Sequence, residues 1–386
     1  MRLRRTMALL TLASLLPGLM SGCSRGVKSE TVVIPDSAGD LSSSTGREPF
    51  EVKTIYRLQG TEPDRWLGWT DDRTLLGASG NSERAETLTE LGTPYDTGRK
   101  ALDLGSGESA LALSPDGSAV VTLASANGSV SLSLVRLSDG GRTPIDSLHG
   151  SQLLSRQATW SDNGRYVSYL AQDDQDSAAY LGVYDTVQGG LNRYGLPDWQ
   201  KLNKLAPIKL ADDGASALTS SWSETGEKVL LLAREGDAYA IRYEHSMSGA
   251  DSFDWLNPNQ FLFTDGDDSL CVYDKRNGSL SLLLGGISRF KLSPDKKTIA
   301  YIRNEDAVFA GQLQGNNVLN EKTVYQGVIP SGLIWSPDHE SLLVSGWKPY
   351  GRDTQPMPVP SETAAPSRQM QAVQDVSSNI LEFSGT

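Results

Sequence analysis

The sequence contains few of the residues that usually carry catalysis and metal binding. Its 386 residues include only two cysteines and three histidines. The histidines form no H-E-x-x-H pair, and neither a G-x-S-x-G nucleophile turn nor a phosphate-binding glycine loop occurs. The sequence therefore predicts no catalytic residue, no metal site and no cofactor, although an enzyme built only on carboxylates would leave no such motif.

Long apolar runs and a basic charge balance are also absent. No apolar stretch reaches the roughly 18–20 residues that a membrane-spanning helix needs. Lys and Arg number 35 against 47 Asp and Glu, which gives a net charge of −12. A chain this acidic is not expected to bind a nucleic-acid backbone, because that needs clustered Lys and Arg.

The N-terminus has the order of an export signal. Three arginines precede an apolar stretch at 7–16, and small residues lead to Cys23. The stretch "LMSGC" (19–23) resembles a bacterial lipobox, with Met20 where that pattern usually has Leu. The resemblance implies that residues 1–22 are a lipoprotein signal peptide and that Cys23 carries the lipid. An ordinary cleaved signal or a short uncleaved anchor is the alternative.

Residues 23–48 are rich in Ser, Gly and Asp and predict a flexible tether after the lipidated cysteine. A tether of this length has a root-mean-square reach of roughly 25–30 Å. We therefore expect an extracytoplasmic protein attached by lipid to a membrane of the cell envelope, with inner and outer membrane both open. Cys271 lies in the apolar run "SLCVYD" and is expected to be buried and unpaired.

One phrase recurs along the chain, as in "LALSPDGSAVVTLA" (111–124), "ATWSDNGRYVSYLA" (158–171) and "LIWSPDHESLLVSG" (333–346). Each copy has a short apolar strand that ends in Trp or Leu, a polar turn, and a second apolar strand. The residues before the turns, called the markers here, are Trp69, Leu113, Trp160, Trp222, Trp255, Leu292 and Trp335. Their spacing averages about 44 residues, which is typical of propeller blades.

The W-S-P-D-G turn between two apolar strands resembles the WD40-like PD40 repeat of TolB-type β-propellers. The resemblance implies an all-β chain whose residues 49–386 form a single β-propeller of about seven four-stranded blades. Six is the alternative, because the 33 residues after Trp222 leave no obvious fourth strand. All marker tryptophans are expected in the core. Residues 349–367 are expected to be a long loop, and 368–385 to supply strands that close the ring beside 50–58.

The loops between second and third strands are rich in carboxylates. If they share one face, it is acidic and could dock a basic partner, or it could be ordinary solvated surface. The carboxylates are Glu83, Glu86, Asp173, Asp174, Asp176, Glu235, Asp237, Asp265, Asp267, Asp268, Glu305 and Asp306. The candidate partner-binding residues among them are Asp173, Asp174, Asp176, Asp265, Asp267 and Asp268.

The 62-residue interval between Trp160 and Trp222 predicts an insertion at 196–214 on the same face. Within it, Trp199 with Lys201 and Lys204 could bind a peptide or a sugar, since loops on rigid scaffolds commonly carry recognition. The alternative is that Trp199 folds down as a lid on the core.

These observations favour a membrane-anchored, non-catalytic propeller that acts as a binding or scaffold module for an envelope protein partner. It is expected to be monomeric and to bind no nucleic acid. The alternatives are recognition of cell-wall carbohydrate and, further off, a carboxylate-based hydrolase or lyase in the central channel.

Overall fold

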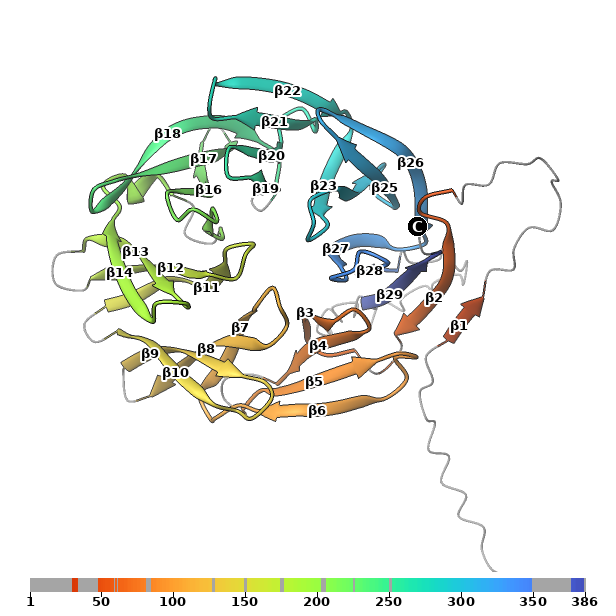
Figure 1. Cartoon of the computed structure of the whole chain (residues 1–386), viewed down its shortest axis with the longest axis horizontal. Coiled ribbons are helices and arrows are strands. Elements are labelled where there is room, and N and C mark those ends of the chain that lie inside the picture. Colours follow the sequence, from red (N-terminus) through yellow and green to blue (C-terminus); the bar gives the residue numbers. More distant parts are fainter. Residues whose placement is uncertain are drawn as a thin grey trace, which may run out of the picture.

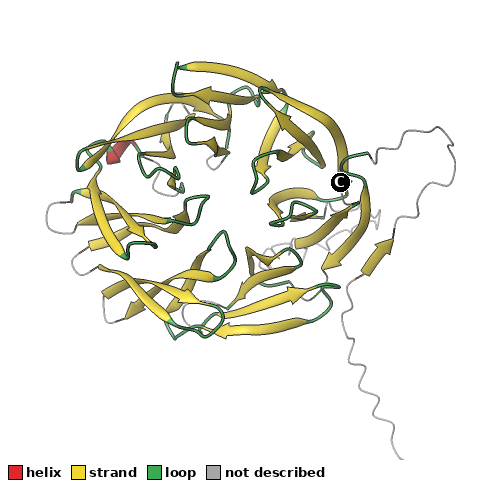
Figure 2. Cartoon of the chain, in the orientation of Figure 1, coloured by secondary structure: helices red, strands yellow, loops and turns green. Residues whose placement is uncertain are grey.

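The computed structural model describes residues 30–33, 48–58, 60, 62–80, 85–126, 129–148, 151–173, 177–202, 206–224, 226–249, 252–348 and 376–384. These residues form a ring of β-sheets around a central axis (Figure 1). The one helical element among them is the 3-10 turn η1 (Trp199–Lys201), visible in Figure 2. None of the helical structure in the described ranges is long and apolar enough to cross a membrane.

Four blades are separate sheets of four strands, in which the first strand lies nearest the axis. The first two blades contain β3 (Arg65–Asp71), β4 (Thr74–Ser79), β5 (Thr87–Gly92) and β6 (Gly98–Asp103), then β7 (Glu108–Leu113), β8 (Ala119–Ala126), β9 (Ser129–Arg136) and β10 (Arg142–Leu148). The other two contain β19 (Phe253–Asn257), β20 (Gln260–Thr264), β21 (Leu270–Asp274) and β22 (Ser279–Leu284), then β23 (Ile287–Leu292), β24 (Thr298–Arg303), β25 (Ala307–Gln314) and β26 (Asn317–Gln326).

A fifth blade joins the two ends of the folded chain. Strand β29 pairs with β28 on one side and with β2 on the other, so strands from both ends of the folded chain lie in one sheet and close the ring. The short β1 adds to the outer edge of β2, within the segment expected to be a tether. From the axis outward, the strands of this fifth blade are β27 (Ile329–Trp335), β28 (Ser341–Trp347), β29 (Val376–Phe383), β2 (Val52–Leu58) and β1 (Glu30–Val33).

The sixth sheet is a continuous sheet of eight strands. Its two halves meet where β14 and β18 form one parallel pair, Gly195 with Ala238, and the Gly195 amide donates to the Asp237 carbonyl at 2.8 Å. The strands are β11 (Ser151–Trp160), β12 (Tyr166–Asp173), β13 (Ala179–Asp185), β14 (Gly190–Gly195), β15 (Lys209–Leu210), β16 (Ser216–Ser223), β17 (Gly226–Glu235) and β18 (Ala238–Met247).

The prediction of an all-β propeller is confirmed, but the predicted number of blades is wrong. The structure has five separate blades and one eight-stranded sheet, not about seven or six separate four-stranded sheets. The reason is the hydrogen bond between the outer strands β14 and β18, a contact between two peptide groups that no side-chain pattern encodes.

The marker tryptophans tie each inner strand to the sheet before it. Each indole Nε1 donates to the carbonyl of the residue that precedes a marker position. The pairs are Trp69 to Ile334 (3.2 Å), Trp160 to Ala112 (3.5 Å), Trp255 to Lys209 (2.8 Å) and Trp335 to Lys291 (3.1 Å). A large indole with a polar edge therefore satisfies a backbone carbonyl while its ring fills the space between sheets.

The same bonds show that Trp222 is not a marker, which corrects the prediction. Because Trp255 bonds to Lys209, the marker position of that inner strand is Leu210, and the "ADDG" turn follows it. Trp222 lies near the end of the second strand β16 and is 69% exposed. The sequence "WSETG" (222–226) resembles the marker phrase, but it follows the second strand of the blade and not the first. Residues 196–214 are thus the passage from β14 into the inner strand β15, not an insertion.

The polar turns after the markers share one hydrogen-bond pattern. In "SPDG", Ser114 Oγ donates to Asp116 Oδ1 at 2.6 Å and accepts the Ala119 amide at 3.0 Å. Equivalent serines at 161, 293 and 336 bond in the same way to Asn163, Asp295 and Asp338. These side chains satisfy the turn's backbone where the ladder of the hairpin ends.

Candidate functional site

Trp199 and Lys201 lie in η1, between β14 and β15. Trp199 is half-buried and packs against the apolar core shared by β13, β16 and β17, as the lid alternative requires. The ammonium of Lys201 pairs with Asp198 at 2.8 Å. Lys204 lies outside the described residues, as does Cys23.

The acidic loops are only partly assembled on one face. Glu235 and Asp237 flank the turn between the third and fourth strands β17 and β18, on the opposite face from the loops with which they were grouped. Glu86 is buried in an ion pair with Arg65 at 2.7 Å. Glu86, Glu235 and Asp237 therefore do not contribute to the predicted docking face.

The loop between β20 and β21 does carry exposed carboxylates. Asp267 and Asp268 are exposed, whereas Asp265 accepts two amides of its own turn and contacts the thiol of Cys271 at 3.7 Å. Asp173 ends β12, and Asp174 and Asp176 lie outside the described residues. Cys271 is buried as expected, and burial together with Asp265 raises the pKa of its thiol to about 11.

A second group of charges, which the sequence did not predict, surrounds the axis. We call it the axial cluster: Asp162, Lys209, Asp212, Asp254, Lys291 and Lys296. Lys209, Asp254 and Lys291 come from the inner strands β15, β19 and β23, each at the residue before a marker position. Asp162, Asp212 and Lys296 come from the turns that follow β11, β15 and β23.

The members of the axial cluster hold one another at short range. The Lys296 ammonium lies 2.9 Å from Asp162 and 3.9 Å from Asp254. The Lys209 ammonium lies 3.5 Å from Asp254 and donates to the Phe253 carbonyl at 2.6 Å. Lys291 has no hydrogen bond or ion pair of this kind among the described residues, although its charge interacts with Asp254 and Asp162. The cluster therefore contains one lysine without a close partner.

Burial and neighbouring charges shift the pKa values of the cluster in opposite directions. Burial raises the pKa of Asp254, but the charges of the three lysines outweigh it and hold that pKa below its usual range. Burial, together with Lys209 and Lys296, lowers the pKa of Lys291. Burial and the carboxylate of Asp254 raise the pKa of Asp162. Groups whose pKa values are pushed in this way concentrate at functional sites.

A cavity of about 180 Å³ opens at the turn end of the axial cluster. Asp162, Asp212 and Lys296 line it together with Trp255 and Pro258. Pockets for small molecules typically measure about 300–1,000 Å³, and one water occupies about 30 Å³ of liquid. The cavity therefore has room for a single side chain or a small charged group.

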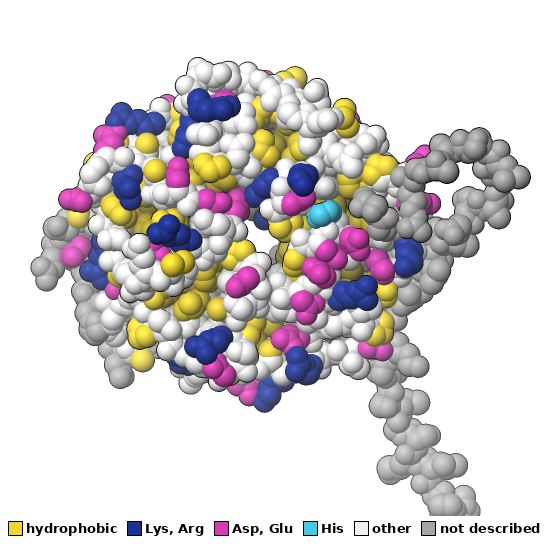
Figure 3. All heavy atoms as spheres, viewed as in Figure 1, with side chains coloured by type: hydrophobic (Ala, Val, Ile, Leu, Met, Phe, Trp, Pro, Cys, Tyr) yellow, Lys and Arg dark blue, Asp and Glu magenta, His cyan; other side chains and the backbone are white. Residues whose placement is uncertain are grey.

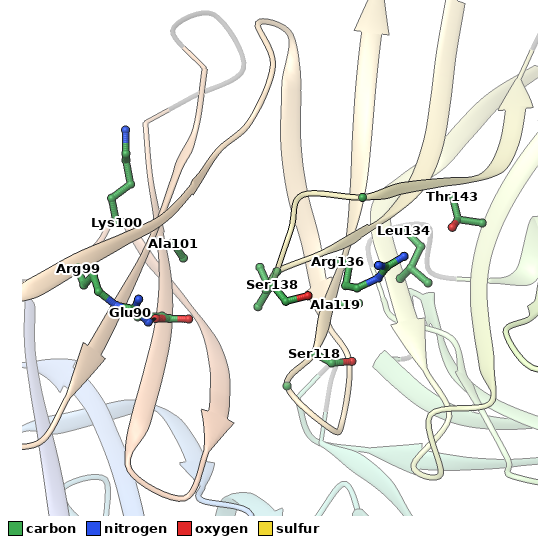
Figure 4. Close-up of a pocket in the computed structure, with 13 residues that line it drawn as sticks. Glu90, Arg99, Lys100, Ala101, Ser118, Ala119, Leu134, Arg136, Ser138 and Thr143 are labelled. Carbon is green, nitrogen blue, oxygen red and sulfur yellow. Dashed lines mark hydrogen bonds and ion pairs between the residues drawn. The ribbon is translucent and has the colours of Figure 1, made fainter.

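A larger groove of about 590 Å³ lies between the first two blades (Figure 4). Its three basic side chains already have acidic partners: Arg99 pairs with Glu90, Lys100 with Asp103 and Arg136 with Asp139. On the face shown in Figure 3, acidic and basic side chains lie intermixed around the ring. The axial cluster is therefore the stronger candidate site, because it contains the buried Asp254 and a partly buried lysine, Lys291, that lacks a close partner.

The described residues contain no group of three or more His, Cys, Asp or Glu side chains that could hold a metal ion. The axial cluster contains three lysines and three carboxylates, and Asp254 has ammonium groups as its close partners.

No family model and no curated protein sequence matches the chain. Among solved structures, it is similar to an oligogalacturonate lyase in complex with manganese, at 9% identity over 92% of this chain and 98% of that chain, with a TM-score of 0.56. It also matches TolB from Acinetobacter baumannii, at 13% identity over 64% and 66% of the two chains and a TM-score of 0.40. A third match is the C-terminal WD40 domain of Sif2, at 13% identity over 83% and 97% and a TM-score of 0.45.

The chain spans 33% of the tricorn protease chain, which it also matches. At these identities the likeness shows the fold alone. The expectation of a β-propeller is confirmed at that level, by the sheet arrangement of this chain and by the likeness to the lyase structure.

Proposed function

We propose that this chain is a membrane-anchored, non-catalytic propeller that binds an envelope protein at the turn end of its axis. The observation that carries the proposal is Lys291, a partly buried lysine of the axial cluster that has no ion pair within 4 Å among the described residues. An acidic side chain of the partner, entering through the cavity beside Asp162 and Lys296, would supply that missing counter-charge.

The proposed anchor is the lipid on Cys23, which would keep the propeller at the membrane surface of the cell envelope. The support is the signal-like order of residues 1–23. Residues Glu30–Val33 follow as β1, so the chain that leaves the anchor joins the propeller within a few residues.

The acidic loop at Asp265, Asp267 and Asp268 is a second docking surface to test. Trp199 and Lys201 are weaker candidates, because the core holds Trp199 and Asp198 holds Lys201. A photocrosslinking residue placed at Pro258, on the cavity wall, reports on the axial site. The same residue at Asp267 reports on the acidic loop. The proposal expects one protein captured in cells from Pro258 and lost when Lys291→Met is added.

Capture of that protein from Asp267 alone, unaffected by Lys291→Met, would move the docking site to the acidic loop. No protein captured from either position would contradict the scaffold role and favour a carbohydrate ligand. Binding to cell-wall carbohydrate would depend little on salt, whereas docking through charge weakens as salt rises.

A lyase is the second candidate, and the lowered pKa of Lys291 favours it. Elimination beside a uronate carboxylate needs a base that removes the α-proton and positive charge that stabilises the developing anion. The β carbon–oxygen bond to the leaving sugar then breaks as the carbon–carbon double bond forms. Lys291 in its neutral form could be that base, with Lys209 and Lys296 holding the carboxylate. The manganese of the similar lyase structure finds no matching ligand group among this chain's described residues, so no step is assigned to it.

The lyase candidate is tested by incubating the purified chain with oligogalacturonate and following the ultraviolet absorbance of the unsaturated product. Turnover that rises with pH and disappears in Lys291→Met would replace the scaffold proposal. No turnover with oligogalacturonate at any pH would remove this candidate.

A further inference from the structure

A groove of about 350 Å³ lies between β26 and the strands β2 and β29 of the closing blade, away from the axial cluster. Its volume falls within the roughly 300–1,000 Å³ typical of small-molecule sites. The lining side chains that can donate hydrogen bonds are Arg57, Tyr325, Gln326, Lys348, Ser377 and Asn379, and no carboxylate lines it. A groove lined by donors and free of carboxylates fits an anion.

Asn379 gives this groove an unsatisfied donor. The residue is only 1% exposed, and its side-chain amide nitrogen has no hydrogen-bond partner among the described residues. A buried donor left unpaired typically costs about 1–3 kcal/mol. An acceptor oxygen from a bound anion would remove that cost.

The charge of the groove is positive in a chain whose net charge is −12. Arg57 and Lys348 are its only charged lining residues. Glu62 lies close enough to Lys348 for that lysine to lower its pKa, but burial is the larger effect and raises it. Glu62 does not line the groove. Its carboxylate accepts a hydrogen bond from the Ser378 amide at 2.5 Å.

The groove lies where the chain from the proposed lipid anchor reaches the propeller. In the β1–β2 pair, Glu30 lies opposite Arg57 and Val32 opposite Ile55, so the chain enters β1 at the Arg57 end. Cys23 precedes Glu30 by seven residues, and seven extended residues span at most about 25 Å. A lipid on Cys23 therefore holds this end of the closing blade close to the membrane surface.

Exposed apolar side chains flank the groove on the same end of the blade. Ile329 and Trp347 lie opposite each other in the β27–β28 pair and are 43% and 38% exposed. They follow and precede the groove residues Val328 and Lys348 in sequence. Tryptophan beside a basic residue is typical of surfaces at the membrane–water interface.

We propose that this groove binds the phosphate of a membrane lipid headgroup, with Arg57, Lys348 and Asn379 as its donors and Ile329 and Trp347 against the interface. The phosphate site stands on the groove alone, and the membrane as its source rests on the proposed anchor at Cys23. Headgroup binding would fix the closing blade against the membrane and orient the axial site relative to it.

The test is native mass spectrometry of the full chain purified in mild detergent, with phosphatidylglycerol as the probe lipid. Lys348 is exposed, so Lys348→Gln leaves the fold intact, and Arg57→Gln with Lys348→Gln removes both charges. The double variant should retain the lipid at least about tenfold less than the wild type. Arg99→Gln with Lys100→Gln, in the groove of Figure 4, is the matched control and should retain it fully.

Equal retention by the wild type and the Lys348→Gln and double variants, or no retention by any of them, would overturn the proposal. Stabilisation of the wild type by soluble glycerol phosphate without lipid retention would overturn the membrane as the source. The intact mass of the protein reports separately whether Cys23 carries a lipid, so a failed anchor and a failed groove are distinguishable.

Discussion

At the scale of single residues, the molecule keeps charges near its axis by pairing them. Removing an ion from water costs several kcal/mol, and close opposite charges must offset this cost. Asp254 is 7% exposed and has two lysine ammonium groups within 3.9 Å. Removal of its charge would leave the partly buried ammonium groups of Lys209 and Lys296 without this counter-charge. Asp254 is therefore expected to matter more than any exposed carboxylate.

The variant Asp254→Asn is expected to lower the free energy of unfolding by about 3 kcal/mol at pH 7, as measured by urea denaturation. Because the folded pKa of Asp254 lies below its usual value, the stability it contributes is present above about pH 4 and is lost as the pH falls through the folded pKa. The variant should therefore lose less stability than the wild type on acidification. Asp139→Asn, which breaks the exposed pair with Arg136, should cost less than about 1 kcal/mol.

Two tryptophans in similar sequence contexts should respond differently to replacement. Trp255→Phe removes the bond to Lys209 and leaves space in the core, so a loss of about 1–3 kcal/mol is expected. Trp222→Phe should change stability by less than about 0.5 kcal/mol, because the ring is exposed. Equal losses in thermal unfolding would show that Trp222 is a core residue after all.

At the scale of elements, the inner hairpins are set by their turn residues. The serine and the Asp or Asn two residues later bond the turn, and the next residue adopts a positive φ. That residue is glycine at Gly117 and Gly164, which adopt a positive φ without strain, and Lys296 or His339 in two other turns. Some of these turns also lie against the neighbouring blade. A Cβ on Gly117 would come within 2.2 Å of the Thr70 carbonyl oxygen, whereas one on Gly164 meets no atom closer than 3.7 Å.

Gly117→Ala and Gly164→Ala separate the two effects, since both glycines have φ of 71°. Gly164→Ala should cost about 1 kcal/mol, from the backbone conformation alone. Gly117→Ala should cost about 3 kcal/mol, because the first blade must also shift away from the turn. Chemical denaturation of both variants measures the difference. Equal costs would mean that the turn conformation, not the contact with Thr70, limits this position.

The elements were largely predictable because their patterns are local. Alternating apolar residues, the Ser–Asp turns and the closing strand at "NILEF" can be read from neighbouring residues. The marker at Leu210 was missed because Trp222 stands in a similar phrase, and an indole is a stronger pattern than a leucine. Taking Trp222 as the marker also prevented prediction of the axial cluster. With Leu210 as the marker, Lys209, Asp254 and Lys291 all lie at the position before a marker.

At the scale of the whole molecule, the ring depends on β29, a strand separated from β28 by the stretch 348–375. β29 pairs with both β28 and β2, and its Ile380, Leu381 and Phe383 are buried. Without it, β2 would lose its neighbour toward the axis. The two ends of the chain would then no longer meet in one sheet.

A chain that ends at residue 375 is expected to lose cooperative thermal unfolding and to bind a hydrophobic dye, because the inner face of the closing blade becomes exposed. A chain that ends at residue 384 keeps all of β29 and is the control. Cooperative unfolding of the shorter chain near the control's midpoint would show that the ring does not need this strand.

The sites on the ring were less predictable than the ring itself. Ion pairs between strands 40 or more residues apart, such as Lys209 with Asp254, depend on how neighbouring sheets are placed around the axis. The acidic loops could be read from composition, but composition did not reveal that Glu86 is buried with Arg65. The number of charged residues in a loop can be counted from the sequence. Which of these charges pair with one another depends on the assembled fold.

The most direct test of the proposed binding role is the dissociation constant for the protein captured at Pro258, measured with the purified chain and two lysine variants. Lys291→Met removes the partly buried lysine of the axial cluster that lacks a close partner, and Lys297→Met removes an exposed one. We expect Lys291→Met to weaken binding at least about tenfold and Lys297→Met to change it less than about twofold. Equal affinities for the two variants would contradict the axial site as the place where the partner binds.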